Sequence, residues 1–194
     1  MNHDKRVAIE DAKQIVNNPD NYVILDTETT GLYDCEIVQI GIIDLAGNTL
    51  LDTLVKPTCP ISEGATAIHG ITAADVANAP TFKPVRDLIE LMTHNKIVII
   101  YNAGFDDEVL YHCCKVNNLN YLKYESICAM ELYSNFVGDM HPHFNNYRWQ
   151  KLPGGDHTAI GDCKATLSVL ESMAATLLEM GQLDLEKETD DIPY

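Results

Sequence analysis

The chain has few basic residues for its length. Its 194 residues include 13 Lys and Arg against 29 Asp and Glu, which gives a formal net charge of −16. Broad non-specific binding to duplex nucleic acid requires a basic surface, so the composition argues against that function. The acidic composition remains compatible with a pocket that binds only the end of a nucleic-acid strand through metal ions. It is also compatible with a protein partner that delivers that strand.

Long apolar runs are missing as well. The longest, such as residues 97–101, are far too short to span a bilayer, and the polar N-terminus is followed by no apolar segment. We therefore expect no membrane association, no signal peptide and a cytoplasmic location. The six cysteines form no Cys-x-x-Cys pair and no zinc-ligand spacing, so we interpret them as reduced packing residues.

Neither an internal repeat nor a linker divides the chain. With 46% hydrophobic residues, it can bury a sizeable core. We predict a single domain over residues 1–181, with an N-terminal helix at 6–17 and a core at 21–181. An acidic tail is expected to follow at 182–194.

The apolar periodicity predicts an α/β fold. Expected strands cover residues 22–25, 36–44, 49–56 and 96–101, and short turns join the first three into an antiparallel meander. Expected helices beyond the first cover 61–72 (one short turn, then a loop), 82–94, 102–118, 127–135 and 156–180, with Gly181 as a C-cap. Residues 137–155 are predicted to be mostly loop.

Two carboxylates close the first strand. The run Tyr22–Leu25 is typical of a buried strand, yet it ends on Asp26, and Glu28 follows two residues later. Residues two apart share one face of a strand, so these carboxylates point the same way, about 7 Å apart. Like charges held there repel unless a cation lies between them, and a hard divalent ion such as Mg²⁺ suits the oxygens. Taken alone, such a pair more often begins a solvated turn.

Two further polar clusters stand at the ends of buried elements. Asp106 follows the strand at 96–101, and His157 and Asp162 begin the last long helix. If these ends converge, the four carboxylates would be neutralised by two divalent cations. Such a pair of ions suits phosphodiester hydrolysis with histidine as the general base. An isolated histidine is more often structural, but the clusters together favour the functional interpretation.

Three motifs carry a family resemblance. They are Asp26-Thr27-Glu28-Thr29-Thr30-Gly31, Asn102-Ala103-Gly104-Phe105-Asp106 and His157-Thr158-Ala159-Ile160-Gly161-Asp162. In this order they resemble the motifs of the DEDDh 3′–5′ exonucleases, over about residues 22–180. The resemblance implies an RNase H-like fold, a mixed five-stranded sheet of an antiparallel meander plus parallel strands, flanked by helices. It also implies two Mg²⁺ or Mn²⁺ ions and release of nucleoside 5′-monophosphates from a free 3′ end.

The resemblance also implies a role for each motif residue. Asp26, Glu28, Asp106 and Asp162 would bind the metal ions, and His157 would take a proton from the attacking water. The residues 65–72 resemble the stretch that contacts the terminal nucleotide in this family. The candidates for substrate binding are Thr29, Thr30, Gly31, Leu32, Ala65, Ile68, His69, Asn102 and Phe105.

Some of these assignments leave alternatives open. Leu32 resembles a residue that packs on the terminal base, whereas Phe105 is either a wall of the pocket or plain core. Only Pro153–Asp156 separates Leu152 from His157, where many family members carry a longer helix and loop. The shape of the substrate channel on that side is therefore open. Several aromatic side chains in this region either stack on unpaired bases there or belong to a structural loop: His141, His143, Tyr147 and Trp149.

We therefore expect a 3′–5′ exonuclease that acts on single-stranded DNA ends. An exonuclease for short RNA, of the oligoribonuclease or RNase T kind, is the alternative within the same chemistry. A catalytically inactive interaction module is the alternative from another class, but such a module should have lost one of the five catalytic residues, and all five are present. The sequence leaves the oligomeric state open.

Overall fold

The computed structural model describes residues 2–188, and for residues 177–188 it describes the backbone course only. The strands are β1 (Tyr22–Thr29), β2 (Ile37–Ile43), β3 (Thr49–Leu54), β4 (Ile97–Ile100) and β5 (Glu125–Cys128). The helices are α1 (His3–Asn17), α2 (Glu63–His69), α3 (Phe82–Thr93), α4 (Ala103–Val116), α5 (Ala129–Val137) and α6 (Ala159–Glu188), with a 3-10 turn at Pro19–Asn21. None of the described helices is both long and apolar enough to cross a membrane.

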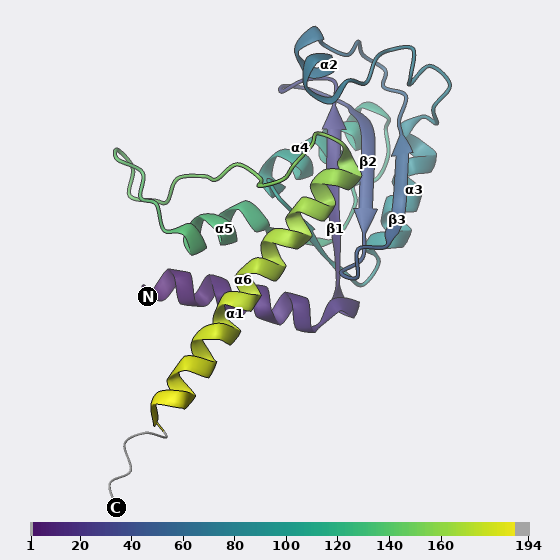
Figure 1. Cartoon of the computed structure of the whole chain (residues 1–194). Helices are drawn as coiled ribbons and strands as arrows, with labels where there is room; N and C mark the ends of the chain where they lie inside the picture. The colour runs from purple at the N-terminus through teal and green to yellow at the C-terminus, as the bar shows by residue number, and fades with distance from the viewer. Residues whose placement is uncertain (1, 189–194) are drawn as a thin grey trace, which may run out of the picture.

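The strands form one sheet in the order β3-β2-β1-β4-β5. Strand β2 is antiparallel to both β1 and β3, whereas β1, β4 and β5 run parallel. This confirms the predicted mixed sheet of a meander plus parallel strands. In Figure 1, α6 crosses in front of the sheet and over α1, and α3 and α4 lie behind the sheet.

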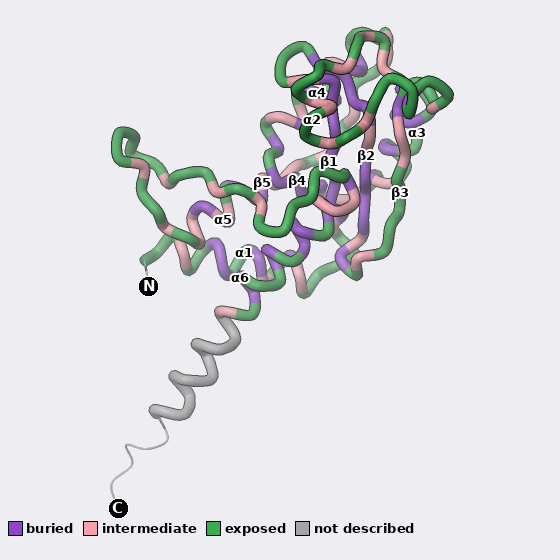
Figure 2. Tube along the Cα trace, turned by 45° about the horizontal axis from the view of Figure 1, so that its top comes forward, coloured by how far each residue is buried: buried purple, intermediate pink, exposed green. Residues whose placement is uncertain are grey.

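Alternation along β1 divides the core into two layers. Val23 and Leu25 face a cluster that includes residues of α3 and α4, while Ile24 faces a cluster built with α1, α5 and α6. All three side chains are buried. Burial of each such aliphatic side chain stabilises the folded state by about 1.5–3 kcal/mol. Figure 2 shows burial concentrated on the central strands and on the helix faces turned toward them. The sheet therefore holds β1 rigidly between two helical layers.

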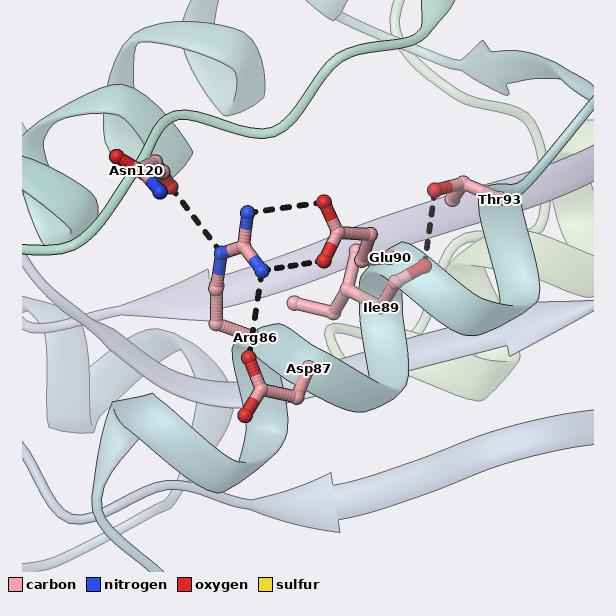
Figure 3. A network of polar contacts seen from close by, with 6 residues as sticks. All are labelled: Arg86, Asp87, Ile89, Glu90, Thr93 and Asn120. Atoms are coloured by element: carbon pink, nitrogen blue, oxygen red, sulfur yellow. Dashed lines mark hydrogen bonds and ion pairs between the residues drawn. The ribbon is translucent and has the colours of Figure 1, made fainter.

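A buried arginine connects α3 to the segment before β5. The Arg86 guanidinium donates two hydrogen bonds to the Glu90 carboxylate and one to Asp87, and its Nε donates to the carbonyl oxygen of Asn120 at 3.1 Å (Figure 3). Arginine can satisfy several acceptors in one plane, which explains why it is tolerated in the core. We assign this network a structural role.

Several predicted boundaries differ from the structure. The helix expected at 127–135 is α5 and begins at Ala129, because Glu125–Cys128 pair with β4 as the edge strand β5. The N-terminal helix begins at His3 rather than residue 6, since the side chain of Asn2 caps it by accepting from the Lys5 N–H at 2.8 Å.

The last helix differs at both ends. Helix α6 begins at Ala159 rather than Asp156, and it runs through Gly181 to Glu188 instead of ending there. A glycine inside a helix costs only about 1 kcal/mol, and good helix formers follow it. Residues 182–188 of the predicted tail are thus helical, and residues 189–194 lie outside the described residues.

Candidate active site

Strand β1 extends beyond its parallel neighbour. Its pairing with β4 ends at Ile24 opposite Ile99, whereas its pairing with β2 continues to Thr29 opposite Ile37. Asp26 and Glu28 lie on this projecting part and share the face that α6 covers. Asp26 is half-buried and Glu28 is buried, as expected for carboxylates at the edge of a core.

A glycine on β2 allows α6 to approach this face. Gly41 pairs with Asp26, and a Cβ atom added to it would lie 2.8 Å from the carbonyl carbon of Ala159. One turn further along α6, the Cys163 Sγ lies 3.6 Å from the Ile24 carbonyl oxygen and 3.5 Å from that of Gly41. The first turn of α6 is therefore seated directly against β1 and β2, beside Asp26.

The loop before α6 is held by hydrogen bonds to acidic side chains. The Oδ1 atom of Asp162 accepts the backbone N–H groups of Asp156 at 2.8 Å and His157 at 3.2 Å. Asp156 in turn accepts from the Thr158 N–H at 3.0 Å, and the Thr158 hydroxyl oxygen accepts from the Gly161 N–H at 3.1 Å. His157 adopts a left-handed backbone conformation with φ of 60°. These bonds offset the cost of that conformation and fix the backbone from which the imidazole projects.

Glu28, His157 and Asp162 meet at one point. Each offers one ligand atom, and these atoms all lie within 4.8 Å of one another. The three come from β1, from the loop before α6 and from the first turn of α6. Asp26 and Asp106 lie outside this tight group. Among residues 2–176, whose side chains the structure describes, these three form the one group of histidine, cysteine or acidic residues close enough to hold a metal ion.

Asp106 reaches the site from the other layer. It lies in the first turn of α4, is buried, and accepts a hydrogen bond from the Thr27 hydroxyl at 2.6 Å. Thr27 faces α4 because it alternates with Asp26 and Glu28 along β1. The predicted carboxylates thus converge on the projecting end of β1, two from the strand and one from each adjoining helix.

Neighbouring negative charges raise the pKa values of the two carboxyl groups of β1. The pKa of Asp26 is raised well above its usual range, first by burial and then by the charges of Asp106, Asp162 and Glu28. Burial, followed by Asp162, Asp106 and Asp156, raises the pKa of Glu28 to about 8. Burial also raises the pKa of Asp106. This accumulation of uncompensated negative charge is what divalent cations with oxygen ligands relieve, so the donor set fits such ions.

A first cavity of about 660 Å³ opens beside Glu28. Eight of the nine residues predicted to bind substrate line it: Thr29, Thr30, Gly31, Leu32, Ala65, Ile68, His69 and Phe105. The ninth, Asn102, lines a neighbouring second cavity of about 460 Å³. Phe105 is half-buried and lines both cavities, so it is a wall as well as part of the core.

His69 is restrained by two hydrogen bonds. Its Nδ1 accepts the Ile71 N–H at 3.0 Å, so its Nε2 carries the proton and donates to the Thr29 carbonyl oxygen at 3.1 Å. The imidazole thereby connects the C-terminal end of α2 to the end of β1. The Ser62 N–H adds a second connection by donating to the Thr30 carbonyl oxygen at 2.9 Å. Helix α2 is consequently fixed as one wall of the first cavity.

Sequence reasoning missed other lining residues of this cavity. These are Tyr33, Asp34, Cys59, Pro60, Ser62 and Gly64. Of these residues, only Ser62 has a recognisable sequence signal, because serine often precedes a helix. Its hydroxyl caps α2 by accepting from the Ala65 N–H at 3.1 Å.

The aromatic residues of the 137–155 loop have different positions. Trp149 lines the second cavity, whereas the other three line neither of these two cavities. The Tyr147 hydroxyl instead donates to Asp4 at 2.8 Å, and the His141 and His143 rings contact each other. For His141, His143 and Tyr147 the structure thus favours the structural-loop alternative.

Comparison with known proteins agrees with this geometry. A family model described as an exonuclease, RNase T, matches residues 23–170. The uncharacterized exonuclease CP81 of Escherichia phage 186 is 39% identical over 173 residues, covering 80% of this chain and 89% of that protein. Exodeoxyribonuclease 10 of Escherichia coli K12 is 33% identical over 156 residues, covering 76% of this chain and 66% of that protein.

A solved structure gives the same picture of the fold. Exonuclease X in complex with 5′ overhanging duplex DNA aligns with a TM-score of 0.56 and 30% sequence identity, covering 80% of this chain and 92% of that one. The RNase H-like fold is thereby confirmed. Several other relatives are much longer, and the chain spans 12% to 54% of their length. The chain belongs to the RNase T exonuclease family and is a nuclease of the exonuclease class, as its three motifs indicated.

Proposed function

We propose that this protein is a 3′–5′ exonuclease that removes nucleoside 5′-monophosphates from single-stranded DNA ends with two Mg²⁺ or Mn²⁺ ions. The observation that carries the proposal is the convergence of Glu28, His157 and Asp162, with ligand atoms within 4.8 Å, beside a cavity of nucleotide size. The names of two similar proteins, exodeoxyribonuclease 10 and exonuclease X bound to DNA, support DNA as the substrate.

The four acidic residues would hold the two ions at the scissile phosphodiester. Glu28 and Asp162 face His157 and would hold one ion, and Asp26 would contribute a further oxygen ligand. Asp106, buried and bonded to Thr27, would support the second ion from α4. When bound, such ions supply Lewis-acid stabilisation of the attacking and leaving oxygens.

His157 would act as the general base. Its ring is exposed, so water reaches it, and its backbone is fixed by Asp162 so that the imidazole lies beside Glu28. A ring nitrogen would accept the proton of the attacking water as the new P–O bond forms and the bond to the leaving 3′ oxygen breaks. The leaving oxygen becomes the new 3′ hydroxyl of the shortened strand.

The first cavity would receive the terminal nucleoside. Leu32 and Ile68 are 73% and 58% exposed and offer apolar surface for a base. Glu28 lines the same cavity and belongs to the acidic group. A terminal nucleotide seated there places its 5′ phosphate toward the acidic group. We expect an unpaired end, because contacts with these apolar side chains would replace the stacking of the base on its neighbour in a duplex.

The experiment compares matched DNA and RNA oligonucleotides labelled at the 5′ end, in Mg²⁺ and in EDTA. The proposal expects stepwise shortening from the 3′ end, 5′-monophosphate products and complete dependence on the metal. Internal cuts or shortening from the 5′ end would overturn it. Faster hydrolysis of RNA would replace the DNA assignment with the short-RNA alternative, since the 2′-hydroxyl is the difference between the substrates.

A further inference from the structure

The second cavity has no role in the function proposed above. It measures about 460 Å³ and adjoins the first cavity, with which it shares Leu32, Tyr33, Asp34 and Phe105. Residues that line only this cavity include Asn102 just before α4, Glu108 and His112 of α4, and Trp149 of the loop before α6. A strand whose last nucleotide fills the first cavity would pass over the shared wall into the second.

The lining of the second cavity suits a nucleobase and not a phosphate. It contains the carboxylates of Asp34 and Glu108 and no lysine or arginine. A phosphate would be repelled by these acids, since no permanent positive charge opposes them. A planar aromatic ring would instead meet Phe105, Tyr33 and Trp149, the kinds of side chain on which unpaired bases stack.

The backbone around Trp149 is held in place although the residue is exposed. Trp149 is 69% exposed, yet the backbone is anchored on both sides of it. Before it, the Arg148 N–H donates to the Asp139 carbonyl oxygen at 2.7 Å. After it, the Tyr101 hydroxyl donates to the Gln150 carbonyl oxygen at 3.0 Å, which connects this loop to the end of β4. An indole carried on a fixed backbone is a suitable stacking surface, because the loop itself loses little conformational freedom on binding.

We propose that the second cavity binds the nucleobase next to the terminal one, and that Trp149 is the stacking surface for that base. The inference rests on the proposed exonuclease function. It makes Trp149 a substrate-binding residue that none of the three exonuclease motifs contains. It also defines the preferred substrate as a 3′ end with at least two unpaired nucleotides.

The test pairs enzyme variants with substrate variants. Two single-stranded DNA oligonucleotides carry a labelled terminal phosphodiester, and in one of them the second nucleotide from the 3′ end lacks its base. Loss of one base–aromatic stack corresponds to roughly 5- to 150-fold, so the native protein should release the terminal nucleotide about tenfold more slowly from the abasic substrate. In Trp149→Ala this difference should disappear, and in Trp149→Phe most of it should remain.

Phe144→Ala provides the matched control. Phe144 is 65% exposed in the same loop and lines neither of the two cavities, so this variant should keep the full abasic penalty. The same penalty in native protein and in Trp149→Ala, or no penalty in native protein, would overturn the inference.

A binding measurement separates this inference from the proposed function. Trp149 is the chain's single tryptophan, so intrinsic fluorescence reports on it alone. With Ca²⁺ in place of Mg²⁺, and with saturation established by anisotropy of a 5′-fluorescein label, the normal oligonucleotide should quench the tryptophan and the abasic one should not. Equal quenching by both would contradict the subsite. Absence of hydrolysis of any substrate, with this difference in quenching intact, would contradict the proposed function and leave the subsite standing.

Discussion

The backbone N–H of His157 donates to Oδ1 of Asp162 at 3.2 Å, so one carboxylate both faces Glu28 and fixes the histidine loop. The same oxygen accepts the Asp156 N–H at 2.8 Å. Asp162 therefore has two separable tasks, one that requires its charge and one that requires only an acceptor oxygen. Substitutions that remove one or both of these properties should have different effects.

Asp162→Asn keeps an acceptor oxygen and removes the charge, whereas Asp162→Ala removes both. Both variants should lose at least about 100-fold in activity, because several kcal/mol of metal-assisted stabilisation depends on the charge. Amide hydrogen exchange at Asp156 and His157 should accelerate only in Asp162→Ala. Equal exchange in the two variants would show that the loop is held by other contacts.

His157→Ala should reduce kcat by about 10²- to 10⁴-fold, the usual contribution of a general base. The imidazole is exposed, so the melting temperature should stay within error of the parent protein. Added imidazole should restore part of the rate. Native activity in this variant would show that His157 is not the general base, whichever residues bind the metal ions.

Gly41→Ala should impair the site without removing any functional group. The added Cβ would lie 2.8 Å from the Ala159 carbonyl carbon, so the first turn of α6 must shift away from Asp26. We expect a loss of about 1–3 kcal/mol in unfolding free energy together with weaker Mn²⁺ binding, measured by denaturation and calorimetry. Gly104→Ala is the stability control, because its Cβ would meet nothing within 4 Å.

The metal-free protein should become less stable as pH rises. Glu28 has its pKa raised from 4.5 to about 8, first by burial and then by neighbouring carboxylates, and the pKa of Asp26 is raised as well. A carboxyl group with a raised folded-state pKa keeps its proton in the folded state after the unfolded chain has released it. Stability therefore falls as pH increases from about 4.5 to about 8.

Melting curves in EDTA and in Mg²⁺ across this range check that prediction. The gain in melting temperature from Mg²⁺ should increase with pH, because the ions relieve repulsion that exists only between charged carboxylates. Glu28→Gln should show a flatter dependence in EDTA. A Mg²⁺ effect that does not change with pH would contradict the electrostatic account of the site.

The convergence of the acids could be anticipated from the sequence because each lies near one end of a strongly patterned element. Asp26 and Glu28 follow the apolar run of residues 22–25 within β1, and Asp162 lies in the first turn of the longest helix, α6. Strand ends and helix starts meet at the edges of α/β sheets, so the pattern predicts proximity. Strand β5 was missed because it is an edge strand of four residues that contains Glu125 and Ser126, with no apolar alternation.

The cavities could not be anticipated in the same way. Tyr33 and Asp34 lie in a loop, and their contribution depends on where α2 and α4 lie in space. The sequence alone could not show which of the four aromatic residues in this loop lies near the substrate. Only Trp149 of the four lines the second cavity, because the hydrogen bond from Tyr101 to Gln150 holds this part of the loop there.

The most direct test of the central claim is the single-turnover rate of Asp26→Ala on a single-stranded DNA oligonucleotide in saturating Mg²⁺. We expect a loss of about 10³-fold or more with the fold intact by circular dichroism, because Asp106, Asp162 and Glu28 all lie close enough to Asp26 to raise its pKa, so these groups would share the bound ions. A variant that hydrolyses the strand at the parent rate would contradict the assignment of this site.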